Sequence, residues 1–177
     1  MAKKRKKSTL GLVFSAGAVL FAIAAVCMMF LNAVELVSGE NVLAQYTGVQ
    51  VAFGYSETCP IIGEVKFLNF SIMNLLPYIL ALAGAVVALL AALSRKSFLL
   101  NIIAVACFVA AAVFFFTAAS YVSVAGSEGS GTLNVLVKNI VDALKDGDNL
   151  KIAIGSILGG AFSIVAAACS ALKIFVK

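Results

Sequence analysis

The sequence predicts an all-α membrane protein: a four-helix transmembrane bundle with a small extracellular antiparallel β-sheet and a short amphipathic extracellular helix. The first observation behind this fold class is composition. The 177 residues are 63% hydrophobic and only 12% charged, whereas an average soluble domain is about 45–50% apolar and about 25% charged. The second is that the apolar residues gather in four runs, and the third is that all acidic residues fall on one side of them. The expected spans are about 10–31, 72–93, 98–121 and 150–172.

Each run is long enough to cross a bilayer, which takes about 20 apolar residues in a helix. Lipid offers the backbone no hydrogen-bond partner, so each span is expected to be helical. A cleaved signal peptide is the alternative for the first span, but its apolar run exceeds the usual length of about 7–15 residues. We therefore expect a single four-span membrane domain over residues 1–177, with outer loops at about 32–71 and 122–149.

The distribution of charge sets the expected orientation. Nine of the thirteen cations fall on one side of the membrane: Lys3, Lys4, Arg5, Lys6, Lys7, Arg95, Lys96, Lys173 and Lys177. All eight acids fall on the other side. Because cationic loops stay in the cytoplasm, both termini are expected inside, in a plasma (inner) membrane. The opening cationic run is then an anchor that sets topology and contacts anionic lipid, and no nucleic-acid partner is expected.

The first outer loop carries strand patterns. The stretch "VQVAFGY" alternates in a way that places Val49, Val51, Phe53 and Tyr55 on one side of a strand. The stretch "LAQYTGVQV" predicts a hairpin that turns at Thr47-Gly48, and "EVKFLNF" predicts a third strand. Together these patterns predict a small antiparallel sheet whose apolar face packs over the outer ends of the helices.

The second outer loop combines a Gly/Ser-rich hinge with a helical pattern. Apolar residues recur at helical spacing after a plausible N-cap, Thr132, and before a stop at Gly147. The helix would be too short to span a membrane, so its apolar stripe must be covered by lipid or by protein. It lacks Trp and Phe anchors, and we expect protein. The contact candidates on this stripe are Leu133, Leu136, Val137, Ile140, Val141 and Leu144.

The fourth span is rich in small residues at four-residue spacing. Ser156 and Gly160 form one small-xxx-small pair, and Gly159 and Ser163 form another. Such pairs let helices approach closely in membranes. Two interpretations remain open: packing within one bundle, or a face for self-association.

The sequence carries no pattern typical of catalysis. The chain has no histidine, and no ionisable residue lies deep in a span, where ion and proton pathways normally place one. The acidic stretch "DALKDGDN" does not match the spacing of a calcium loop. We therefore expect no catalytic, cofactor or metal site. Asn74 and Asn101, near the span ends, are expected either to hydrogen-bond between helices or to line a pore.

The order of the parts resembles the layout of claudins and other tetraspan proteins. The similarity lies in four spans, inner termini, a long first outer loop with strands, a short inner turn and a smaller second outer loop. The claudin first-loop signature, with tryptophans followed by two cysteines, is absent, since the chain has no Trp and only Cys59 in that loop. The tetraspanin Cys-Cys-Gly is absent as well. The charge layout also suits a small bacterial inner-membrane protein.

Two functional hypotheses follow. The first is a non-enzymatic structural or accessory membrane protein that acts through contacts with membrane lipids and with a membrane protein partner or a second copy of itself. The second is a small channel or transporter for a neutral or lipid-like solute. An enzyme ranks third, because the outer carboxylates have no obvious partner base.

Overall fold

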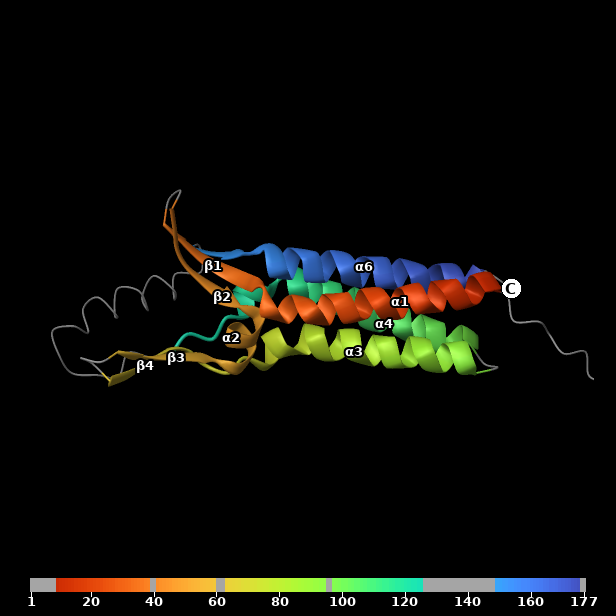
Figure 1. Cartoon of the computed structure of the whole chain (residues 1–177), viewed down its shortest axis with the longest axis horizontal. Helices are drawn as coiled ribbons and strands as arrows, with labels where there is room; N and C mark the ends of the chain where they lie inside the picture. Colours follow the sequence, from red (N-terminus) through yellow and green to blue (C-terminus); the bar gives the residue numbers. More distant parts are fainter. Residues whose placement is uncertain (1–8, 39–40, 60–62, 95–96, 126–148, 176–177) are drawn as a thin grey trace, which may run out of the picture. The chain divides into compact units, whose positions relative to one another are not determined.

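The computed structural model describes residues 9–38, 41–59, 63–94, 97–125 and 149–175. Helices dominate, and short strands follow the first helix and precede the last (Figure 1). The elements in chain order are α1 (Thr9–Cys27), η1 (Met28–Phe30), β1 (Asn32–Ser38), β2 (Asn41–Thr47), α2 (Gly48–Phe53), β3 (Tyr55–Cys59), β4 (Gly63–Leu68), α3 (Ile72–Leu93), α4 (Ser97–Phe116), η2 (Ala118–Tyr121), β5 (Leu150–Ile152) and α6 (Ile154–Phe175).

Four helical segments are long and apolar enough to cross a membrane: Leu10–Phe30, Ile72–Leu93, Phe98–Phe116 and Ile154–Phe175. The chain forms two compact units. The bundle unit comprises the described residues within Met1–Val26, Pro77–Val113 and Gly159–Lys177. The cap unit comprises those within Cys27–Leu76 and Phe114–Leu158.

Buried residues in the bundle unit recur every three or four positions along each helix. This spacing places one stripe of each helix against its neighbours, as in left-handed helix bundles. The stripes are Ser15, Ala18, Ala22 and Ala25 in α1, Ala81, Ala85, Ala88 and Ala91 in α3, Asn101, Ala104, Phe108 and Ala111 in α4, and Ser163, Ala166, Ala167 and Ser170 in α6. Small side chains dominate the interior, while large aliphatic side chains such as Leu20, Val86 and Val109 are exposed, as expected for surfaces that face lipid.

Close helix approach is visible at two glycines. A Cβ atom added to Gly84 of α3 would lie 2.6 Å from Cε1 of Phe108 in α4, so the ring occupies the space that the missing side chain leaves. A Cβ atom on Gly17 of α1 would lie 3.5 Å from Sγ of Cys169 in α6. Without a hydrophobic effect between helices in lipid, such van der Waals contacts are a main source of stability.

The cap unit contains a three-stranded antiparallel sheet in the order β2-β1-β5 and a separate two-stranded sheet of β3 and β4. The central strand β1 pairs with β5 from the second outer loop, with Val34 opposite Ile152 and Leu36 opposite Leu150. Between these pairs Glu35 faces Lys151, and opposite charges directly across a sheet are mildly stabilising. The sheet therefore joins the segment between α1 and α3 to the segment between α4 and α6.

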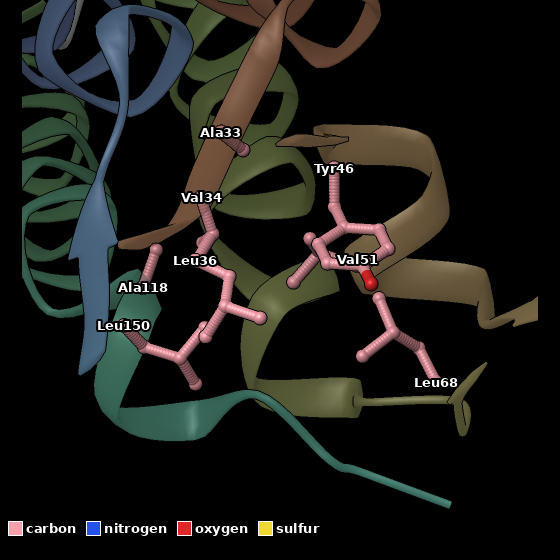
Figure 2. Close-up of a cluster of buried hydrophobic side chains, with 8 residues drawn as sticks. All are labelled: Ala33, Val34, Leu36, Tyr46, Val51, Leu68, Ala118 and Leu150. Carbon is pink, nitrogen blue, oxygen red and sulfur yellow. The ribbon is translucent and has the colours of Figure 1, made fainter. Parts of the chain in front are cut away.

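The core of the cap unit lies between these strands. Figure 2 shows side chains from β1, β2, α2, β4, η2 and β5 directed toward one another. The buried cluster consists of Ala33, Val34, Leu36, Tyr46, Val51, Leu68, Ala118 and Leu150. An aromatic row extends the cluster, with Tyr46 edge-on to Tyr55 at 6.1 Å between ring centroids and Tyr55 stacked on Phe67 at 6.1 Å.

The expected fold class is confirmed in the described part of the chain: a mostly helical protein with four candidate membrane helices and small antiparallel sheets, whose strands β1 to β4 lie between α1 and α3 in the chain. The expected hairpin turn at Thr47-Gly48 is wrong. The hairpin of β1 and β2 turns earlier, after Ser38, and "GVQVAF" forms α2. A capping box decides this, because the Thr47 side chain accepts from the Gln50 amide while the Gln50 side chain accepts from the Thr47 amide.

Two span boundaries also differ from expectation. The third span was expected to reach residue 121, but α4 ends at Phe116 and the chain continues as the 3-10 helix η2. The fourth was expected from residue 150, but Leu150–Ile152 is drawn into the sheet as β5. The third strand of the first outer loop is confirmed as β4, but it pairs with β3 and not with the hairpin.

Gly84→Ala should lower the stability of the bundle by about 1–3 kcal/mol, the usual cost of overpacking a filled interior. Thermal unfolding in detergent provides the measurement. Gly11→Ala is the matched control, because nothing lies within 4 Å of a Cβ atom at Gly11 and both substitutions gain the same helix propensity. Adding Phe108→Leu to Gly84→Ala should restore part of the loss. Equal melting of the Gly84 and Gly11 variants would contradict the contact.

Candidate functional site

The small residues of α6 face the interior of this chain. Ser156, Gly159, Gly160 and Ser163 are all buried. The Ser156 hydroxyl donates to the Ala33 carbonyl of β1 at 2.8 Å, and the Ser163 hydroxyl donates to the Gly159 carbonyl of the preceding turn at 2.8 Å. In this arrangement they contribute to packing within one chain and offer no exposed surface to a second copy.

The two asparagines lie in different units. Asn74, in the first turn of α3, belongs to the cap unit, and Asn101, in the second turn of α4, belongs to the bundle unit. Asn74 donates through Nδ2 to the Ser71 hydroxyl at 3.3 Å, and Ser71 donates to the Tyr121 carbonyl at 2.8 Å. This chain of hydrogen bonds ties the start of α3 to η2, which supports a structural role for Asn74.

Asn101 belongs to a polar layer of the bundle unit that includes Ser15 and Ser170. Each of the three is at least 96% buried, and each has a side-chain oxygen without a hydrogen-bond partner. Ser15 and Asn101 lie three residues before the buried alanines Ala18 and Ala104, and Ser170 lies three residues after Ala167. The three alanines belong to one buried cluster. The heptad-like spacing of small residues is the sequence signal that could have identified this layer.

Lys173 lies one turn beyond Ser170 in α6, and its ammonium nitrogen is buried. Helical side chains tilt toward the helix N-terminus, which for Lys173 is the direction of Ser170. From the sequence, Lys173 was identified only as one of the cations expected on the cytoplasmic side of the membrane. Its buried position was not evident, because the direction of a lysine at a helix end depends on the neighbouring helices.

The described part of the cap unit has an exposed strand edge at β2. β2 is one edge of the three-stranded sheet, and Asn41, Val42 and Leu43 at its beginning are exposed. Unpaired edge groups invite pairing with another strand, and natural proteins usually protect them with charge or proline. β2 carries neither. Sequence reasoning missed this edge because it placed the hairpin turn at the wrong end of β2.

Further in along β2, Tyr46 fixes the strand in the cap core. Burial raises the pKa of the Tyr46 phenol above its ordinary value, and the neighbouring Tyr55 and Glu57 raise it further. The phenol therefore stays neutral at physiological pH, as its place in an apolar cluster requires.

The remaining contact candidates, on the expected outer amphipathic helix, lie outside the described residues. Within the described ranges, no group of three His, Cys, Asp or Glu side chains could hold a metal ion. Comparisons with protein-family models, curated protein sequences and solved structures found no match to this chain. The geometry therefore offers two features to interpret: an uncharged strand edge in the cap unit and a buried polar layer in the bundle unit.

Ser71→Ala should lower the thermal unfolding midpoint in detergent, because the Tyr121 carbonyl loses its donor and the Asn74 amide loses its acceptor. Leaving buried partners unsatisfied costs about 1–3 kcal/mol. Ser120→Ala is the control, since Ser120 is exposed on η2 and should melt like the parent chain. If the two variants melt alike, the hydrogen bonds of Ser71 do not contribute to the stability of the cap unit.

Proposed function

We propose that this chain is a non-enzymatic structural or accessory membrane protein that binds a membrane protein partner through its cap unit. The observation that carries the proposal is the edge of β2, where uncharged, partly apolar residues border a sheet that is held in place on its other side by β5. Strand addition at such an edge supplies main-chain hydrogen bonds, and side chains such as Val42 and Leu43 supply specificity.

The rival function is a small channel or transporter for a neutral or lipid-like solute. The unpartnered oxygens of Ser15, Asn101 and Ser170 favour it, because polar groups inside a membrane often mark a pathway. The adjoining interior of the bundle unit is closed, however. It is filled by alanines and by Phe108, which is fully buried. A solute pathway would therefore have to run between copies of the chain.

For location, we propose the plasma (inner) membrane with both termini in the cytoplasm, and a claudin-like or tetraspan-like layout in which the cap unit lies outside. Nine of the thirteen cations lie on one side of the expected spans and all eight acids lie on the other. Because cationic loops stay in the cytoplasm, this distribution supports the proposed orientation.

A photocrosslinking side chain at Val42 tests the contact function in native membranes. We expect one reproducible adduct with an identifiable membrane protein from Val42, and little from Thr58, an exposed position on β3. A second substitution, Leu43→Lys, should reduce the adduct, because a charge protects a strand edge against pairing. Equal adducts from Val42 and Thr58 would remove the support for the edge. Solute flux from vesicles containing the pure protein would favour the rival.

The orientation is tested with single cysteines in a chain whose native cysteines are replaced. Ser56→Cys lies in the cap unit and Ser94→Cys follows α3, and both positions are exposed. An impermeant maleimide applied to intact cells should label the Ser56 variant and spare the Ser94 variant until the membrane is opened. The reverse pattern would invert the topology.

A further inference from the structure

Three phenylalanines in the cap unit are exposed although they are large and apolar. Phe30 is 74% exposed, Phe53 is 55% exposed and Phe70 is 53% exposed. Phe30 ends the first candidate span, and Phe70 precedes α3 by two residues. The rings of Phe53 and Phe70 lie 6.4 Å apart between centroids. The three side chains thus belong to segments that adjoin the outer ends of two membrane helices.

The short helix α2 joins these segments. It packs against η1, and the amide of Gly48 at its start donates to the Leu31 carbonyl at 3.1 Å. At its end the Ala52 carbonyl accepts from the amide of Ser71 at 3.0 Å. α2 is therefore fastened at its first turn to the end of one span and at its last turn to the beginning of another.

Backbone groups at both ends of the six-residue helix α2 have hydrogen-bond partners. Helix ends normally leave four amides and four carbonyls without an intrahelical bond. Here the capping box of Thr47 and Gln50 serves the first turn, and the Gly54 amide donates to the Gln50 carbonyl at 2.9 Å. Partners within the protein matter most where water is scarce, because lipid offers no hydrogen-bond partner to a backbone group.

Charge is also absent from this part of the chain. No Asp, Glu, Lys or Arg occurs from Asn41 to Ser56. The exposed apolar surface continues along the chain from Phe70 into α3 through Ile72 and Met73, which are both exposed. This surface is therefore continuous along the chain with the faces of the spans that contact lipid.

We infer that the outer boundary of the bilayer lies at α2, and that Phe30, Phe53 and Phe70 contact the acyl chains and headgroup region of the outer leaflet. Phenylalanine is among the apolar side chains that insert at this depth, and the absence of charged residues from α2 avoids the cost of placing an ion close to lipid. The tip of the hairpin, with Leu43, lies at the other end of β2 from Thr47 and stays outside the lipid. The inference is independent of the proposed partner contact.

The test uses fluorescence quenching by lipid, which this chain suits because it contains no tryptophan. Phe53→Trp and Leu43→Trp are prepared in the full chain and reconstituted into phosphatidylcholine vesicles whose acyl chains carry bromine either near the headgroup or near the chain end. We expect blue-shifted emission from the Phe53 variant and a larger loss of intensity with the shallow bromine than with the deep one. The Leu43 variant should emit at longer wavelength and lose little intensity with either lipid.

Phe70→Trp in the same vesicles is the second probe, so that a folding defect in one variant does not decide the result. Each variant is compared with the parent chain by thermal unfolding before use. The inference is overturned if the folded Phe53 and Phe70 variants are quenched no more than the Leu43 variant. Stronger quenching by the deep bromine would also overturn it, because α2 would then lie below the interface.

Discussion

The ends of a helix leave backbone groups without intrahelical partners, and the junction of β1 with α6 shows which groups of this chain take their place. The Ala33 carbonyl accepts both the Ala153 amide at 2.9 Å and the Ser156 hydroxyl at 2.8 Å. A Cβ atom on Gly155 would lie 2.7 Å from the Asn32 carbonyl oxygen, so only glycine allows this approach. The strand that organises the cap unit is thereby fixed to the first turn of the last span.

The same junction explains why the second outer loop contributes a strand. Once α6 begins beside β1, residues Leu150–Ile152 run along that strand and complete the three-stranded sheet. β5 then occupies one side of β1, while β2 occupies the other and is an edge strand of the sheet formed by the described residues. The β2 edge, on which the proposed contact function rests, lies on the opposite side of β1 from this junction.

The helices of the bundle unit are held together by close packing of small side chains, and not by the burial of large apolar ones. Lipid is as apolar as leucine, so helices gain little by hiding large aliphatics from it, and close van der Waals packing takes over. Gly84 and Phe108 show the limit of this packing, where one ring fills the space beside one glycine. The polar layer of Ser15, Asn101 and Ser170 is the exception, because buried oxygens without partners are costly. That cost motivates the rival solute-pathway function.

The sequence by itself determined the class of protein. Four apolar runs and the one-sided placement of acids predict the spans, because length and hydropathy alone decide whether a helix can cross lipid. It also predicted a sheet in the first outer loop, but not its pairing. "VQVAFGY" alternates like a strand, yet it begins at a capping box, and local hydrogen bonds at Thr47 outweigh the alternation. The free edge of β2 was missed for the same reason.

Only the tertiary structure decided what the candidate residues do. Asn74 and Asn101 look equivalent in sequence, and each has a buried side-chain oxygen without a hydrogen-bond partner, but Nδ2 of Asn74 donates to Ser71, which in turn bonds to η2. Spacing identified the small residues of α6, but whether they pack within the chain or between copies depends on which helices lie beside them. Phe53 and Phe70 likewise lie close together because the Ser71 amide, just before α3, donates to the Ala52 carbonyl of α2. Such contacts between distant residues leave no periodic pattern, so they become visible only when the chain is folded.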